Sequence, residues 1–199
     1  MGIILFDIDG TLFDPKKFGQ LYRAALAATL AISEENLASV IADYYSTLES
    51  STDFDPNEFI KNVALRFGVD EKLVGDVFWN KDFFMQSRFE EVEAVLKKLS
   101  SQNTLGIFSQ GHKYYQEYKL EHTGLFKYFD PNIIFIYKRK MAGDAENAIP
   151  QGAIIIEDKH DVAKALSAKT KTIWINRMGG ADDPEMDTIH SLEQLTTDN

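Results

Sequence analysis

Cysteine is absent from the 199 residues, which excludes disulfide bonds, cysteine-ligated zinc, iron–sulfur clusters and thiol nucleophiles. Cationic side chains are also in the minority, because 21 Lys and Arg stand against 31 Asp and Glu and give a formal net charge of −10. A non-specific nucleic acid surface needs clustered cations, so we expect no nucleic acid partner. An anionic substrate would need a local positive centre.

Long apolar runs are missing as well. The N-terminal run at residues 3–6 is followed at once by Asp7 and Asp9, and no basic stretch precedes it. It is too short for a membrane span and does not have the pattern of a signal peptide. We therefore expect a soluble protein with no membrane partner, in a cytoplasmic location that the lack of cysteine suits. The residues do not indicate an oligomeric state.

Five short runs rich in β-branched or aromatic residues are separated by helical stretches. They do not alternate apolar with polar residues, which is typical of parallel strands covered on both faces. The runs are residues 3–6, 105–108, 133–137, 154–156 and 172–175. Strands that alternate with helices predict an α/β fold, a doubly wound, Rossmann-like parallel sheet. From residue 188 onward we expect one short helix.

The chain between the first and second predicted strands is much longer than one crossover needs. Apolar residues at helical spacing predict four helices there. Ser33 caps the second, Asp55 followed by proline begins the third, Gly68 ends it, and Asp70 begins the fourth. We therefore predict an all-helical inserted cap at residues 15–85, and an α/β core formed by residues 1–14 and 86–199.

Polar residues follow four of the predicted strands. The first strand ends in Asp7-Ile8-Asp9-Gly10-Thr11, the second in Ser109-Gln110-Gly111, the third in Lys138 and the fourth in Glu157-Asp158. Because ligands bind outside the carboxyl ends of parallel strands, we expect these residues to share one site. Carboxylates are suited to Mg²⁺, and a hydroxyl and an ammonium to phosphoryl oxygens.

The order of these segments resembles that of the haloacid dehalogenase superfamily of phosphohydrolases. The stretch from Phe6 to Leu12 matches the family's first motif in full, Ile107-Phe108-Ser109 matches the second, and Ile155-Ile156-Glu157-Asp158 resembles the acidic fourth. Lys138 is the preferred candidate for the third motif because it ends the apolar run directly, and Lys140 is the alternative. The resemblance covers the chain outside the insert, where many family members carry a helical cap.

The resemblance implies a role for each of five residues. Asp7 would be the nucleophile that forms an aspartyl-phosphate, and Asp9 would be the general acid and base. Ser109 and Lys138 would bind the phosphoryl oxygens. Asp7, the backbone carbonyl of Asp9 and Asp158 would bind Mg²⁺, the expected cofactor.

The acidic fourth motif departs from the commoner family pattern. The family usually has a further Asp four residues after the metal-binding Asp, whereas Asp161 lies three residues after Asp158. We expect Glu157 and Asp161 to act outside the metal's direct ligands.

The function predicted from this resemblance is a Mg²⁺-dependent phosphatase that acts on a small phosphate ester. A phosphomutase of the same superfamily would use the same residues. Dehalogenation fits less well, because a halide needs no proton and dehalogenating members lack a carboxylate at the position of Asp9. A non-catalytic phosphate-binding protein and a receiver-type signalling module are further alternatives. Specificity is expected to come from the insert, whose loop at residues 50–54 is a candidate to face the active site.

Overall fold

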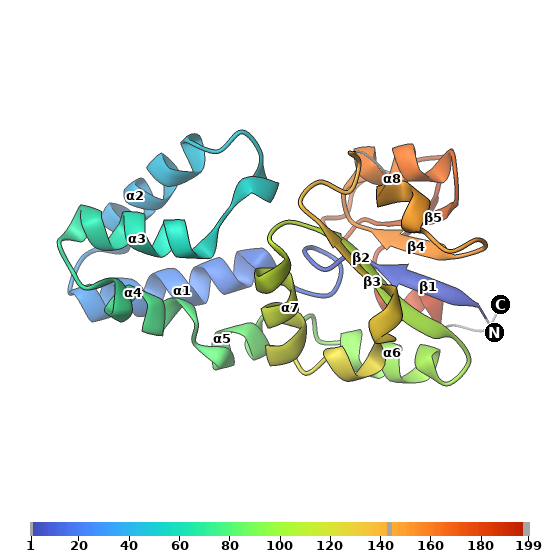
Figure 1. The fold of residues 1–199 in the computed structure, drawn as a ribbon, viewed down its shortest axis with the longest axis horizontal. Helices are drawn as coiled ribbons and strands as arrows, with labels where there is room; N and C mark the ends of the chain where they lie inside the picture. Colours follow the sequence, from blue (N-terminus) through green and yellow to red (C-terminus); the bar gives the residue numbers. More distant parts are fainter. Residues whose placement is uncertain (1, 143–144, 197–199) are drawn as a thin grey trace.

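A computed structural model describes residues 2–142 and 145–196 of the chain (Figure 1). Its core is a six-stranded sheet in which every neighbouring pair is parallel, in the order β3-β2-β1-β4-β5-β6. The strands are β1 (Ile3–Phe6), β2 (Thr104–Gln110), β3 (Ile134–Tyr137), β4 (Ile154–Glu157), β5 (Lys171–Ile175) and β6 (Asp187–Ile189). The predicted α/β, Rossmann-like fold is confirmed, and the strand order reverses next to β1, which is where such sheets bind ligands.

Helices cover both faces of the sheet, which explains the unbroken apolar runs of its strands. The core helices are α6 (Val92–Ser100), α7 (Lys113–His122) and α8 (His160–Ser167). Leu5 of β1 packs in the same cluster as Leu166 of α8, whereas the next residue, Phe6, packs with Leu96 of α6. Adjacent strand residues point to opposite faces, so both must be apolar in a covered sheet. Figure 1 shows α8 and α6 on opposite sides of the strands.

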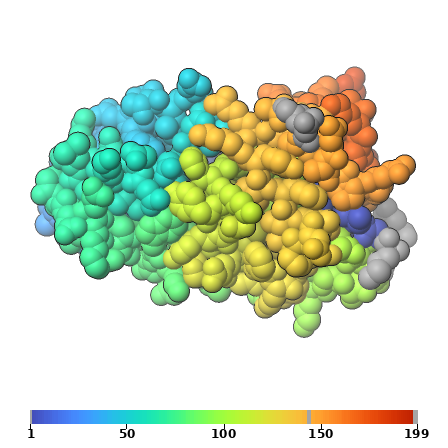
Figure 2. All heavy atoms as spheres, in the orientation of Figure 1, coloured from blue at the N-terminus to red at the C-terminus, as the bar shows by residue number. Residues whose placement is uncertain are grey.

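A helical layer, which we call the cap, lies beside the carboxyl ends of the strands (Figure 1). Figure 2 shows this blue-to-green part of the chain in contact with the yellow and orange core. The cap contains α1 (Pro15–Leu30), α2 (Glu34–Ser46), the short 3₁₀ helix η1 (Ser51–Asp53), α3 (Pro56–Phe67), α4 (Glu71–Phe78) and α5 (Lys81–Gln86). The four predicted helices correspond to α1 to α4, while η1 and α5 were not predicted. Residues 15–85 remain our proposed bounds of the cap.

Local capping positions the cap helices as the sequence indicates. The side chain of Ser33 accepts a hydrogen bond from the backbone of α2, and those of Asp55 and Asp70 do the same for α3 and α4. Such caps satisfy backbone N–H groups that have no partner inside the helix. Gly68 ends α3 with a φ of 64°, a left-handed conformation that glycine adopts without strain.

Within the described residues, no single helix is long and apolar enough to cross a membrane. Only α1 and α2 taken as a pair reach that length and composition, and the pair is bent by 120° at its break.

The C-terminal part of the described chain differs from the prediction of a single short helix. The strand β6 pairs in parallel with β5 before the short 3₁₀ helix η5 (Leu192–Leu195). The missed strand is three residues long and contains one apolar residue, so it lacks the apolar run that marked the other five. The prediction covered the chain from residue 188 onward, and its last three residues, 197–199, lie outside the described residues.

Candidate active site

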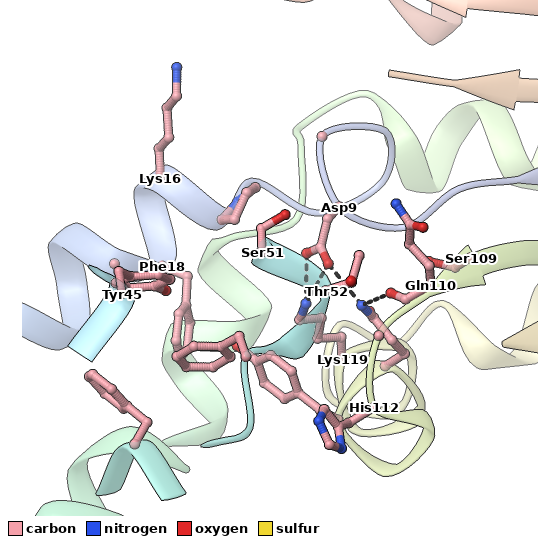
Figure 3. Close-up of a pocket in the computed structure, with 18 of the residues that line it drawn as sticks. Asp9, Lys16, Phe18, Tyr45, Ser51, Thr52, Ser109, Gln110, His112 and Lys119 are labelled. Atoms are coloured by element: carbon pink, nitrogen blue, oxygen red, sulfur yellow. Dashed lines mark hydrogen bonds and ion pairs between the residues drawn. The ribbon is translucent and has the colours of Figure 1, made fainter. Parts of the chain in front are cut away.

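The structure brings four of the predicted site residues to one edge of the sheet. Asp7 and Asp9 follow β1, Ser109 lies at the end of β2, and Asp158 follows β4. All four line one cavity of about 360 Å³ between the sheet edge and the cap (Figure 3). The backbone N–H of Asp7 donates to the carbonyl of Ile156 at 2.9 Å, which continues the β1–β4 pairing up to the site.

Three acidic side chains form a compact cluster at the base of this cavity. Carboxylate oxygens of Asp7, Glu157 and Asp158 lie within 4.8 Å of one another. Burial, followed by the charges of Asp7 and Glu157, raises the pKa of Asp158 to about 8. The Oδ1 atom of Asp158 is buried and has no hydrogen-bond partner among residues 2–142 and 145–196. An orphaned oxygen among mutually repelling carboxylates is what a hard divalent cation would satisfy, so these residues fit Mg²⁺.

Gly10 allows Asp158 to lie against the loop that follows β1. A Cβ atom at Gly10 would lie 2.2 Å from Oδ2 of Asp158, and the φ of Gly10 is +80°. Any other residue would therefore clash with the carboxylate and strain the backbone. The Asp-Gly pair of the first motif thus has a steric reason in this chain.

Lys140, and not Lys138, lies at the acidic cluster. Its Nζ atom donates to Oδ1 of Asp7 at 2.8 Å and to Glu157, and its side chain is completely buried. Burial alone would lower the pKa of Lys140, but the charges of Asp7 and Glu157 outweigh it and raise that pKa. The Lys138 side chain is 60 % exposed, and its Nζ lies 3.6 Å from Asp53 of the cap.

This placement favours Lys140, the alternative, over the preferred Lys138 as the third-motif residue. Lys138 directly follows β3, as predicted, but its side chain faces the cap and solvent. A turn closed by the Ala142 N–H and the Arg139 carbonyl at 3.2 Å follows the strand. That turn directs Lys140 back across β2, where its Nζ also lies 3.4 Å from the carbonyl of Phe108.

Asp9 is held by two residues of α7 to which the sequence assigned no role. The Nζ atom of Lys119 lies 2.6 Å from one carboxylate oxygen of Asp9 and 2.8 Å from the other. Nε2 of Gln116 donates to Asp9 at 2.9 Å. Figure 3 shows the interaction of Lys119 with Asp9 as dashed lines. Gln116 and Lys119 lie one helical turn apart on a helix that follows β2. Polar residues at that spacing are common on solvated helix faces, so the pattern alone did not single them out.

The other acidic residue considered from the sequence lies away from the site. The Asp161 side chain is fully exposed, and its only ionic neighbour among the described residues is His160 of the same helix, at 3.5 Å. Glu157, in contrast, is completely buried beside Asp7 and Lys140. The structure therefore brings Glu157 to the site and does not bring Asp161.

The cap contributes the wall opposite the strands. Ser51, Thr52 and Phe54 line the cavity, so the loop at residues 50–54 faces the site as predicted (Figure 3). Further lining residues come from α1 and from α7. The cavity is thus bounded by acidic and cationic groups at the sheet edge and by the helical insert on the other side.

The first 175 residues match the model of a known family, the haloacid dehalogenase-like hydrolases. The chain belongs to this family. It is 25 % identical over 220 residues to the pyrimidine 5′-nucleotidase YjjG of Escherichia coli (strain K12), and the match covers 96 % of each chain. The family is the one that the sequence resembled, and the α/β core with a helical insert is the architecture that this resemblance implied.

Solved structures have the same fold over nearly the whole chain. The HAD phosphatase from Thermococcus onnurineus is 26 % identical, with a TM-score of 0.61 and coverage of 98 % of this chain and 96 % of that one. The HAD-hydrolase YfnB from Bacillus subtilis, solved with bound magnesium, is 20 % identical, with a TM-score of 0.65 and the same coverage. The helical insert is therefore part of the fold that this hydrolase shares with both.

Proposed function

We propose that this haloacid dehalogenase-like hydrolase is a Mg²⁺-dependent phosphatase of small phosphate monoesters. The observation that carries the proposal is the position of Asp9, which lies two residues after Asp7 and lines the same cavity. Departure of an alcohol from a phosphate ester needs a proton donor, whereas departure of a halide does not. A held carboxylate beside the nucleophile position therefore favours phosphate esters over haloacids.

In the first step, a carboxylate oxygen of Asp7 forms a bond to phosphorus while the ester P–O bond breaks. Asp9 gives its proton to the departing oxygen, so an alcohol leaves and an aspartyl-phosphate remains on Asp7. In the second step, Asp9 takes a proton from water, and the water oxygen attacks phosphorus. Phosphate leaves, and the Asp7 carboxylate is restored.

Two further residues would act on the transferring phosphoryl group. Lys140 contacts Asp7 and would orient that carboxylate while it offsets negative charge. Ser109 is buried at the end of β2, lines the cavity and would donate to a phosphoryl oxygen. Glu157 would hold Lys140 in place from the other side.

Asp7, Asp158 and the backbone carbonyl of Asp9 would hold Mg²⁺. The bound cation would neutralise charge on the phosphoryl oxygens and on the acidic cluster. The unpaired oxygen of Asp158 and the mutual closeness of the three carboxylates support this assignment. The magnesium bound in the YfnB structure is consistent with it.

Phosphate release from a panel of esters tests the proposal. The panel contains nucleoside 5′-monophosphates, because YjjG is a pyrimidine 5′-nucleotidase, together with sugar phosphates and 4-nitrophenyl phosphate. We expect release with Mg²⁺, none with EDTA, and none from the Asp7→Asn variant. Asp161→Asn is the matched control, since it makes the same change on an exposed carboxylate outside the site.

Two results would contradict the proposal. Equal release from the Asp7→Asn variant would reject the covalent mechanism. No release from any ester, by a protein that still binds phosphate, would favour the non-catalytic phosphate-binding protein.

A further inference from the structure

Beyond the acidic cluster, the cavity is walled mainly by aromatic rings. Its volume of about 360 Å³ is near the lower end of the range for small-molecule sites, about 300–1,000 Å³. The Phe and Tyr residues that line it on the cap side and at α7 are Phe18, Tyr22, Tyr45, Phe54, Phe59, Phe78 and Tyr115. A flat apolar leaving group would bury its surface against such rings.

One cationic side chain in this aromatic part of the cavity has no acidic partner. Arg23 of α1 is partly buried and lines the cavity, and it has no hydrogen bond or ion pair with any residue in the described part of the chain. The other four arginines each form an ion pair with a carboxylate: Arg66 with Asp43, Arg88 with Glu93, Arg139 with Asp53 and Arg177 with Glu91. A partly desolvated guanidinium is stabilised by an acceptor, so the unpaired Arg23 points to a ligand.

The Arg23 side chain also extends toward the catalytic end of the cavity. Its Nη1 atom lies 3.8 Å from the place where a Cβ at Gly19 would be, one helical turn closer to the start of α1. Gly19 itself lines the cavity. Glycine in a helix interior is unfavourable by about 0.5–1 kcal/mol relative to alanine. The space left by its missing side chain lies beside the Arg23 guanidinium.

Tyr45 of α2 provides a second donor near Arg23. Its ring stacks on Phe54, with centroids 5.5 Å apart and an interplanar angle of 12°, and it lines the same cavity (Figure 3). Its hydroxyl has no hydrogen bond to another residue within 2–142 or 145–196. The Tyr45 side chain is 47 % exposed. Its partial burial and the charges of Tyr44 and Asp9 raise the pKa of Tyr45 to about 12, and Arg23 acts in the opposite direction. The hydroxyl is therefore protonated and able to donate at neutral pH.

We infer that Arg23 and Tyr45 form the leaving-group subsite of this cavity, where they bind an acceptor oxygen, either carbonyl or carboxylate, on a flat apolar group. The inference rests on the proposed function, because it takes the phosphate of the same molecule to lie at Asp7. The guanidinium of Arg23 can only donate, so it favours an oxygen acceptor over an amine.

Phosphonates that cannot be hydrolysed test the subsite by binding alone. We compare benzylphosphonate, 4-acetylbenzylphosphonate and 4-carboxybenzylphosphonate by calorimetry with Mg²⁺ present. Arg23→Ala should weaken binding of an acceptor-bearing compound by about tenfold or more, and change binding of benzylphosphonate by less than about twofold. Tyr45→Phe should give a smaller loss in the same direction. If Arg23→Ala weakens binding of 4-carboxybenzylphosphonate alone, the leaving group is anionic. If it weakens binding of both 4-carboxybenzylphosphonate and 4-acetylbenzylphosphonate, a carbonyl oxygen is sufficient.

Two variants control for the removal of positive charge. Arg66→Ala makes the same change elsewhere on the cap, at a residue paired with Asp43. Lys16→Ala removes a cation at the cavity mouth whose side chain extends away from Asp9 in Figure 3 and whose Nζ contacts Met178. Neither variant should discriminate among the three phosphonates.

The result that overturns the subsite is an equal loss for all three compounds, or no loss, in the Arg23→Ala variant. The corresponding phenyl phosphates separate this outcome from failure of the proposed function. If the wild-type protein cleaves none of them but still shows Arg23-dependent binding, the phosphatase proposal fails and the subsite stands. If it cleaves them with a kcat/KM that Arg23→Ala lowers equally for all, the subsite fails and the phosphatase stands.

Discussion

The ammonium of Lys119 bridges both carboxylate oxygens of Asp9, at 2.6 and 2.8 Å. Lys119 is 3 % exposed, and its Nζ also lies 4.1 Å from the centre of the Tyr115 ring. A charge buried in this way keeps a fixed partner, since water cannot replace the carboxylate. Together with Gln116, Lys119 therefore holds Asp9 in one orientation toward the cavity, before any substrate binds.

Replacing Lys119 with methionine tests this positioning role. We expect kcat to fall by about 10- to 100-fold, because general acid–base catalysis contributes about 10²–10⁴ and depends on the placement of the carboxylate. The loss should be larger for an alkyl phosphate, whose leaving alkoxide needs a proton, than for 4-nitrophenyl phosphate. Steady-state kinetics on both substrates measure the difference.

Lys113→Met is the matched control for that variant. Lys113 lies on the same helix, but its side chain is 69 % exposed and pairs with Glu117. It should retain wild-type kcat on both substrates. Equal losses on the alkyl and aryl esters in Lys119→Met would show that Lys119 does not act through Asp9.

The two lysines that the sequence could not separate should respond very differently to substitution. Lys140→Ala leaves the buried carboxylates of Asp7 and Glu157 without their cation, so the free energy of unfolding should fall by about 3–5 kcal/mol. Lys138→Ala removes an exposed cation 3.6 Å from Asp53, which keeps its closer pair with Arg139, and should cost less than about 1 kcal/mol. Urea unfolding gives both values, and phosphate release should be lost only in Lys140→Ala. The reverse ranking would restore Lys138 as the third-motif residue.

The contrast between these lysines shows how far the sequence could predict the site. Asp7 and Asp158 follow buried strands directly, and the end of a strand in a parallel sheet fixes the edge on which the next residue lies. Lys140 comes three residues after β3, so its position depends on a turn that no glycine or proline marks. Lys119 depends on how α7 packs against the loop after β1, which is a tertiary contact without a local signal. The strands of the sheet followed from the apolar runs, except for the short strand β6.

Magnesium binding should depend on pH through the carboxyl of Asp158. Its pKa is raised to about 8, chiefly by burial, so in the metal-free protein this group holds a proton below that pH. Mg²⁺ must displace the proton, so its apparent affinity should increase with pH by up to about tenfold per unit until about pH 8, and then level off. The rise in Tm on addition of Mg²⁺ should therefore be larger above pH 8 than near pH 6.

An Asp158→Asn variant tests the cause of this pH dependence. The amide has no proton to lose, so the remaining Mg²⁺-induced rise in Tm should be small and similar at both pH values. A wild-type protein whose Tm responds equally to Mg²⁺ below and above pH 8 would contradict the assignment of Asp158 as a ligand.

A final prediction concerns the ion pairs that join the cap to the core. Nη2 of Arg139, after β3, lies 2.9 Å from Oδ2 of Asp53 in η1, and Lys138 lies 3.6 Å from the other oxygen. Asp53 directly follows Ser51 and Thr52, which line the cavity, so these pairs hold the lining loop against the strand ends. Asp53→Asn should raise KM by about two- to fivefold, with a change of less than about 1 kcal/mol in the free energy of unfolding.

Salt dependence distinguishes this effect from a direct contact of Asp53 with substrate. The cations of these pairs are about half-exposed, so salt screens the pairs in part. The wild-type KM should therefore rise with ionic strength toward that of Asp53→Asn, while KM of the variant changes less. Asp43→Asn is the matched control, because Asp43 pairs with Arg66 on the outside of the cap and should leave KM unchanged at every salt concentration. If KM of wild type and of Asp53→Asn rise in parallel with salt, the loop is not held by these pairs, since the variant has already lost the attraction that salt would screen.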